Sequence, residues 1–314
     1  MLLDIVMVVV GLIGLVAGGN WLVSGASRLA ASFGVSSLII GLTVVAMGTS
    51  SPELLVNISA ALRGASDIAV GNVVGSNVAN VGLILGVAGL LYPIAVRSTL
   101  VRREIPLMIG ASVLTFLLAV DGEIGRVDGV ILMLAFIGFN FLMYRLTVKD
   151  MADHAEDYPA QAEGQGMNRL TQLGYIVLGI VVLGVGAQLM VGGASNLARD
   201  LGVSELVIGI TLVAVGTSLP EMAASVVAAF RRENDITVGN VVGSNIANLL
   251  FVLALTAIIR PIPVAAELMQ VEFPVMIGFA VLVLPFAWNG ILSRRESLLL
   301  LVAYAAFIVV AFVV

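Results

Sequence analysis

The sequence predicts an all-α polytopic membrane protein whose ten transmembrane helices form two inverted five-helix repeats. Composition is the first reason: 60% of the 314 residues are hydrophobic, 11% are charged, and the mean hydropathy is +1.12. A soluble globule of this length needs more polar surface. An internal duplication is the second reason, because the residues around Glu53 recur around Glu221 and one constant offset relates the two halves.

Ten apolar segments are long enough to cross the hydrocarbon core of a bilayer, which takes about 20 helical residues. They cover about 3–30, 36–62, 67–92, 100–119, 126–145, 171–198, 204–230, 235–259, 269–288 and 295–313. We therefore divide the chain into a first repeat, 1–146 (helices 1–5), a polar linker loop, 147–168, and a second repeat, 169–314 (helices 6–10).

The two halves align without a gap. The motif GNVVGSN occupies both 71–77 and 239–245, and the triplet GVS both 34–36 and 202–204. A repeat of five spans crosses the membrane an odd number of times, so its second copy enters from the opposite side. Inverted repeats with broken helices near the midplane are typical of secondary transporters.

Basic residues predict the orientation, because cytoplasmic loops carry an excess of Arg and Lys. One face has Arg63, Arg126, Arg199 and Arg260, and all the other Arg and Lys residues fall on the opposite face. We expect both termini outside and the 147–168 loop in the cytoplasm.

Residue types exclude several kinds of site. Without cysteine, a bound metal must be a hard cation held by oxygen. His154 is the only histidine, which excludes a histidine-rich metal site or proton relay. The acidic residues of the linker lack the spacing of an EF-hand and predict a solvated loop. A net charge of -5 without a basic patch argues against a nucleic-acid partner.

Two nearly identical motifs, GTSSPE at 48–53 and GTSLPE at 216–221, contain the candidate site. Proline at the fifth position kinks each helix around Gly48 or its counterpart and releases backbone carbonyls, which membranes tolerate only where the backbone lines a cavity or is covered by protein. Neither span holds Lys or Arg at that depth. Two unpaired intramembrane carboxylates, Glu53 and Glu221, therefore indicate a cation.

Further oxygens flank the carboxylates at helical spacing. Thr49 and Thr217 lie four residues before the two glutamates, so each pair shares a helix face. In the next span of each half, Ser76 with Asn80 and Ser244 with Asn248 add neutral oxygens. Such an oxygen cage with two negative charges suits Ca²⁺, which takes six to eight oxygens, better than Mg²⁺, which prefers strict octahedral geometry.

Two other sets of residues receive structural interpretations. Glu104 and Glu272, each two residues before a proline, are expected to be helix-dipole charges at the membrane interface. Glycines in the first and sixth spans predict smooth packing faces that would also allow sliding: Gly11, Gly14, Gly18, Gly184 and Gly186.

The paired GTSxPE and GNVVGSN motifs are the basis for a resemblance that covers the whole chain. The chain resembles prokaryotic members of the sodium/calcium exchanger family, within the cation/calcium exchanger superfamily. The resemblance implies that the carboxylates of Glu53 and Glu221 and the backbone oxygens of Thr49 and Thr217 hold calcium. It implies that sodium binds at flanking positions built from Ser50, Ser76, Ser218 and Ser244, with the carbonyls of Ala46 and Ala214. It also implies sliding first and sixth helices and a location in the cell (inner) membrane.

One position departs from the family pattern. Members resembling this chain carry Asp at the place of Asn248, whereas both halves here have Asn, at Asn80 and Asn248. The site therefore has two acids rather than three. This departure makes potassium co-transport less expected and leaves open both the sodium stoichiometry and whether protons replace sodium.

The function predicted is sodium/calcium antiport by alternating access, with calcium, sodium and the lipid bilayer as partners, no prosthetic group and no indicated protein partner. A proton/calcium exchanger on the same scaffold is the nearest alternative, because buried carboxylates also carry protons. A cation channel with a carboxylate ring is a further alternative that the duplication disfavours. An enzyme is least expected, because the sequence shows no nucleophile with a base.

Overall fold

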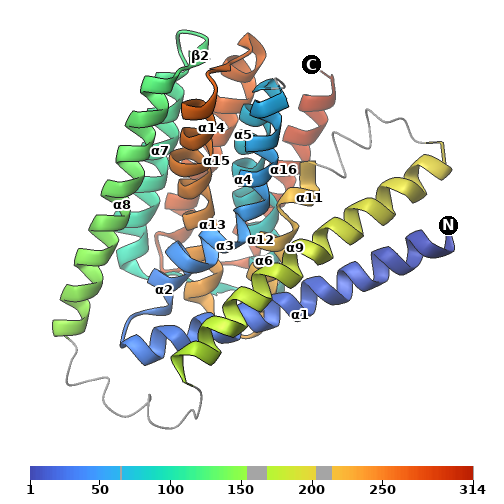
Figure 1. The fold of residues 1–314 in the computed structure, drawn as a ribbon. Coiled ribbons are helices and arrows are strands. Elements are labelled where there is room, and N and C mark those ends of the chain that lie inside the picture. The colour runs from blue at the N-terminus through green and yellow to red at the C-terminus, as the bar shows by residue number, and fades with distance from the viewer. Residues whose placement is uncertain (64–65, 154–167, 203–213, 314) are drawn as a thin grey trace.

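The computed structural model describes the chain except residues 64–65, 154–167, 203–213 and 314, and it is a bundle of helices (Figure 1). Its first half contains α1 (Leu2–Phe33), α2 (Ser37–Ile40), α3 (Ala46–Thr49), α4 (Ser51–Arg63), α5 (Ser66–Ala79), α6 (Gly86–Leu91), α7 (Ile105–Leu118) and α8 (Arg126–Asp153). Its second half contains α9 (Arg169–Asp200), α11 (Ala214–Thr217), α12 (Leu219–Phe230), α13 (Asn234–Ala247), α14 (Leu253–Ile259), α15 (Phe273–Ala287) and α16 (Arg294–Val313).

Short π-helical segments join several of these helices into longer ones. They are η1 (Gly41–Val45), η2 (Asn80–Leu85), η3 (Leu100–Glu104), η5 (Asn248–Val252) and η6 (Leu268–Glu272). Two begin at the equivalent residues Asn80 and Asn248, and two more at Leu100 and Leu268. Local backbone geometry therefore recurs with the sequence, and π-helical segments are frequent at functional sites.

Six helices of the described chain are long and apolar enough to cross a membrane: Leu2–Phe33, Ala69–Leu91, Arg126–Leu146, Arg169–Asp200, Asn234–Ile259 and Leu268–Ala287. The helical segments 37–49 and 51–63 are bent by 42° at the break between them, and they form a seventh candidate span if they are counted as one. The expected spans 100–119 and 295–313 are helical as well, and 204–230 is described only from Ala214 onward. The predicted all-α class is confirmed, while helix α8 continues to Asp153, into the first residues of the expected linker.

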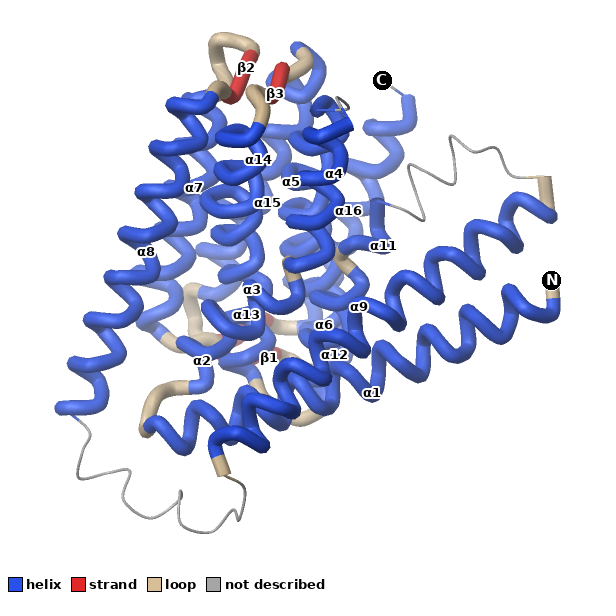
Figure 2. The backbone as a smooth tube through the Cα atoms, viewed as in Figure 1, coloured by secondary structure: helices blue, strands red, loops and turns tan. Residues whose placement is uncertain are grey.

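Four short strands connect the two halves. Strand β1 (Ile94–Ala95) pairs with β4 (Ile291–Leu292), and β2 (Glu123–Ile124) pairs with β3 (Ile262–Pro263), both antiparallel. Each pair joins a strand of one half to a strand of the other. Strand β1 lies at one end of the bundle, and β2 and β3 lie at the opposite end (Figure 2).

Helix α13 runs through the centre of the bundle, where every residue from Ile236 to Ala247 is buried. Its glycines allow close approach: a Cβ on Gly239 would lie 2.9 Å from the carbonyl oxygen of Leu38. On the outside of the bundle, α8 exposes large apolar side chains such as Leu134 and Phe141, as a lipid-facing helix does. The centre is therefore where buried polar side chains can meet.

Helices α1 and α9 lie side by side and antiparallel across one face of the bundle (Figure 1). A Cβ on Gly11 would lie 2.6 Å from the carbonyl oxygen of Gly186, and one on Gly18 would lie 2.8 Å from the amide nitrogen of Leu183. The expected smooth glycine face is therefore present. Gly184 was wrongly assigned to it, because no described atom lies within 4 Å of the Cβ it would carry.

We expect Gly18→Val to lower the midpoint of thermal unfolding, because its side chain would overlap the α9 backbone, and overpacking costs about 1–3 kcal/mol. Gly184→Val is the matched control on the partner helix and should unfold close to the wild type. Circular dichroism of the protein in detergent measures both. Equal midpoints for the two variants would contradict the close glycine packing.

Candidate functional site

Each GTSxPE motif breaks its helix at the serine after the threonine. Ser50 has φ −78° and ψ 6° between α3 and α4, and Ser218 has φ −87° and ψ 6° between α11 and α12. The expected kink around Gly48 is thus displaced by two residues. Proline is tolerated in the first turn of a helix, so Pro52 and Pro220 begin new helices rather than bending one continuous helix.

The carboxylates of Glu53 and Glu221 are both 0% exposed, in the first turns of α4 and α12. The partial positive charge of a helix N-terminus favours a carboxylate at that position. Hydrogen bonds cross between the halves, from Ser50 Oγ to Glu221 Oε1 at 3.0 Å and from Ser218 Oγ to Glu53 Oε1 at 3.5 Å. The two breaks therefore meet in one buried cluster.

Two asparagines that were not assigned a role from the sequence orient the threonines. Thr49 Oγ1 donates to Asn240 Oδ1 at 3.1 Å, and Thr217 Oγ1 lies 3.3 Å from Asn72 Oδ1. Asn240 Nδ2 in turn lies 2.9 Å from Ser225 Oγ. The signal that could have found them was present, because both asparagines are the second residue of GNVVGSN.

The flanking residues of α5 and η2, and of α13 and η5, are buried as well: Ser76 is 2% exposed, Asn80 1%, and Ser244 and Asn248 0%. Asn80 and Asn248 donate hydrogen bonds to Asn245 and Asn77, two further asparagines without a role assigned from the sequence.

Six buried side-chain oxygens of the carboxylates and their flanking residues, three from each half, have no hydrogen-bond partner among the described residues. They are Glu53 Oε2, Ser76 Oγ, Asn80 Oδ1, Glu221 Oε2, Ser244 Oγ and Asn248 Oδ1. A buried polar group without a partner costs about 1–3 kcal/mol. The same three atoms are unpaired in both halves, which is expected if a ligand between the halves binds to electron-pair donors. A hard cation is such a ligand, because it takes oxygen ligands.

At Ala46 and Ala214 the expected ligands are backbone carbonyl oxygens rather than side-chain oxygens. The carbonyl oxygen of Ala46 accepts the amide of Ser50 at 3.0 Å and lies 3.3 Å from Thr49 Oγ1. Because the single hydroxyl proton of Thr49 goes to Asn240, the carbonyl oxygen of Ala46 keeps one lone pair free. Ala214 begins α11 at the equivalent place in the second half.

The interfacial interpretation of Glu104 is wrong. Its side chain is 0% exposed and forms an ion pair with the adjacent Arg103, and the helical stretch begins at Ser98 rather than at the proline. Glu272, at the equivalent position, is partly buried with one buried carboxylate oxygen that lacks a hydrogen bond.

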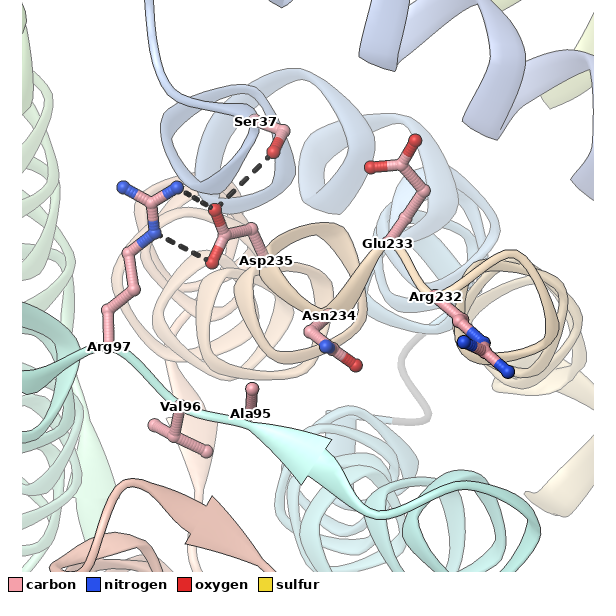
Figure 3. A pocket seen from close by; sticks show the side chains of 8 residues that line it. All are labelled: Ser37, Ala95, Val96, Arg97, Arg232, Glu233, Asn234 and Asp235. Atoms are coloured by element: carbon pink, nitrogen blue, oxygen red, sulfur yellow. Dashed lines mark hydrogen bonds and ion pairs between the residues drawn. The ribbon is translucent and has the colours of Figure 1, made fainter.

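A second polar cluster surrounds a cavity of about 300 Å³ at the β1 end of the bundle (Figure 3). Arg97 contacts both carboxylate oxygens of Asp235, at 2.6 and 3.0 Å, and Ser37 Oγ lies 3.5 Å from the same carboxylate. Because Arg97 neutralises Asp235 and Arg232 lines the same cavity, this cluster lacks the uncompensated negative charge of a cation site.

A family model described as "Sodium/calcium exchanger protein" matches residues 3–145 and 171–313. This chain belongs to the sodium/calcium exchanger family. The predicted resemblance is thereby confirmed, and the matched ranges end on either side of the expected linker. A family of membrane transporters also accounts for the apolar helices.

Relatives in this family match almost end to end. The putative antiporter CaxA of Alkalimonas amylolytica is 38% identical, and the sodium/calcium exchanger MaX1 of Methanosarcina acetivorans is 34% identical, each covering 98% of both chains. The fold is similar to that of the sodium-calcium exchanger NCX_Mj soaked with sodium and calcium, with a TM-score of 0.84, 34% identity and 98% coverage of each chain.

We expect Glu53→Gln and Glu221→Gln each to weaken Ca²⁺ binding roughly 100-fold or more, because removing one buried charge of a paired set costs about 3–5 kcal/mol. The readout is the rise in unfolding temperature that Ca²⁺ produces in the purified protein. Glu123→Gln, at an exposed strand residue, is the matched control. An unchanged calcium-dependent rise in both buried variants would contradict the site.

Proposed function

We propose that this protein is a sodium/calcium antiporter that works by alternating access, in which one buried site binds either Ca²⁺ or Na⁺. The observation that supports this most is the set of six partnerless oxygens around two carboxylates. Of the predicted residues, Glu53 and Glu221 supply the charge. The oxygens of Thr49, Thr217, Ser50, Ser218, Ser76, Ser244, Asn80, Asn248, Ala46 and Ala214 are the proposed further ligands.

The negative charge of the empty site explains why the protein would exchange one ion for another, rather than release an ion and change conformation with the site empty. Two carboxylates in a low-dielectric interior repel each other and have lost their hydration, so the empty, doubly negative site is costly to move through the membrane. A bound Ca²⁺ or a set of Na⁺ ions compensates the charge. Because both ions require the same oxygens, they compete, and a ligand shifts the conformational balance only by its different affinity for the two states.

Alternating access requires two equivalent halves facing opposite sides of the membrane, which we infer here as ten helices in two inverted repeats. The antiparallel packing of α1 on α9 supports this inversion. So do the strands β1 and β3, which occupy equivalent sequence positions but opposite ends of the bundle (Figure 2). We propose that α1 and α9 slide along their glycine face to expose the site to either side.

We further propose that the protein lies in the prokaryotic inner membrane with both termini outside and the 147–168 loop in the cytoplasm, as the distribution of basic residues predicts. On this assignment the β1 end of the bundle, with Arg97 and Arg232, faces the cytoplasm.

Sodium-driven calcium flux into liposomes tests the function. An outward Na⁺ gradient should drive Ca²⁺ uptake into proteoliposomes, while equal K⁺ or proton gradients should not, and Glu53→Gln should abolish uptake. Uptake driven by a proton gradient without sodium would instead favour the proton/calcium exchanger. Single-channel currents would favour a channel.

Polar contacts at the β1 end hold α1 in place in this conformation. Ser27 Oγ of α1 donates to Glu233 Oε1, before α13, at 2.7 Å, and Arg231 donates to Ser24 Oγ of α1 at 2.7 Å. The equivalent of the Ser27–Glu233 bond cannot form in the other half, because Ala65 occupies the position equivalent to Glu233. The contacts therefore favour the position that α1 has in this structure.

We expect the double variant Ser27→Ala and Glu233→Gln to shift the equilibrium about fivefold away from the state with α1 in this position, because a lost hydrogen bond of this kind is worth roughly 1 kcal/mol. The chain has no cysteine, so Ala223→Cys, which lies against Gly19 of α1, can report accessibility to an impermeant thiol reagent. Ser32→Ala, whose hydroxyl donates to the carbonyl of Leu29 in the same helix, is the control. Unchanged labelling of the double variant would refute the restraint.

A further inference from the structure

Four asparagines from both halves form reciprocal side-chain hydrogen bonds beside the site. Asn80 Nδ2 donates to Asn245 Oδ1 at 2.9 Å, and Asn248 Nδ2 donates to Asn77 Oδ1 at 3.2 Å. None of the four is more than 2% exposed. Each pair joins a residue of one half to a residue of the other, so the orientation of each carboxamide depends on the opposite half.

Backbone carbonyls determine which way Asn77 and Asn245 point. Asn77 Nδ2 donates to the backbone oxygen of Asn245 at 3.2 Å, and Asn245 Nδ2 donates to that of Asn77 at 3.3 Å. A backbone carbonyl only accepts, so the NH₂ group must face it. The sulfurs of Met276 and Met108, at 3.8 and 3.6 Å from the same nitrogens, are further weak acceptors.

The orientations of Asn77 and Asn245 determine those of Asn248 and Asn80. With its nitrogen committed, Asn77 presents Oδ1 to Asn248, so Asn248 must present its NH₂ group in return. Asn245 acts on Asn80 in the same way. The oxygens left over, Asn248 Oδ1 and Asn80 Oδ1, are two of the six buried oxygens without a hydrogen-bond partner.

Rotating the side-chain amide of Asn80 or Asn248 by a half turn would be unfavourable for two reasons. Rotation of Asn248 by a half turn would bring its oxygen against Asn77 Oδ1, where its nitrogen now lies at 3.2 Å. It would also put an NH₂ donor where a free oxygen now stands. Two acceptors in contact repel, and a donor in an oxygen cage repels a cation.

We propose that Asn77 and Asn245 are positioning residues, which do not bind the ion themselves but hold Asn248 and Asn80 with their oxygens available to it. This inference rests on the proposed function. It accounts for a cation site with only two acids: the neutral carboxamides supply acceptors without adding charge, and the asparagines behind them prevent the amides from presenting donors. The ligand is a hard cation, Ca²⁺ or Na⁺.

A double-mutant cycle on Ca²⁺ binding tests the proposal in the full-length protein, with isothermal titration calorimetry as the readout. Asn77→Ala should raise the Kd for Ca²⁺ about 10- to 100-fold, as removal of groups that orient metal ligands does. In an Asn248→Ala background, where there is no amide to orient, adding Asn77→Ala should change the Kd by less than about twofold.

Asn80→Ala provides the matched control. Asn77→Ala keeps the backbone carbonyl that orients Asn245, so its effect on Kd should persist in full in the Asn80→Ala background. If the increases in Kd caused by Asn77→Ala and Asn248→Ala multiply in the double variant, the two residues act independently. Asn77 then has a merely structural role and the proposal is overturned. Should Asn77→Ala fail to fold, judged by thermal unfolding without Ca²⁺, Asn245→Ala tests the same proposal with Asn80 as its partner and Asn248 as its control.

The outcomes separate this inference from the proposed function. Coupling in the cycle without sodium-driven flux would support the positioning role and reject antiport. Sodium-driven flux with independent mutational effects would retain antiport and reject the positioning role. A wild-type protein that binds no Ca²⁺ would overturn both.

Discussion

Two fully buried carboxylates share one cluster, and among the described residues no Lys or Arg forms an ion pair with either of them. Each buried ion costs several kcal/mol of lost hydration, and their mutual repulsion adds to that cost. Hydrogen bonds from Ser50 and Ser218 and the N-terminal ends of α4 and α12 offset only part of it. The remaining cost is what a bound cation would compensate.

The helix breaks follow from that requirement. An unbroken helix would satisfy its own amides, whereas a break at Ser50 or Ser218 creates a new helix N-terminus directed at a carboxylate. Around the breaks, Asn240 accepts a hydrogen bond from Thr49, and Thr217 Oγ1 lies 3.3 Å from Asn72 Oδ1. Asn80 and Asn248 use their amide donors on Asn245 and Asn77. The side-chain oxygens of Asn80 and Asn248 have no hydrogen-bond partner among the described residues, which leaves acceptors free near the carboxylates.

Much of this arrangement could be predicted from the sequence, because a duplicated chain shows its pattern twice. The proline in each GTSxPE motif predicts a break, and intramembrane acids without bases predict a cation. Pattern alone placed the break at Gly48, because it does not reveal that proline would start a new helix. It also cannot show pairing between halves, so the roles of Asn77, Asn240 and Asn245 required coordinates. Glu104 was misjudged for the same reason, since its burial depends on neighbours distant in sequence.

We propose that one divalent cation binds between Glu53 and Glu221. Anomalous scattering from crystals of this protein soaked with Sr²⁺ as a heavier substitute for Ca²⁺ tests it most directly. We expect a single strong peak within coordination distance of both carboxylates and near the oxygens of Asn80 and Asn248. A peak at Asp235 and Glu233 instead, or none near either buried glutamate, would contradict it.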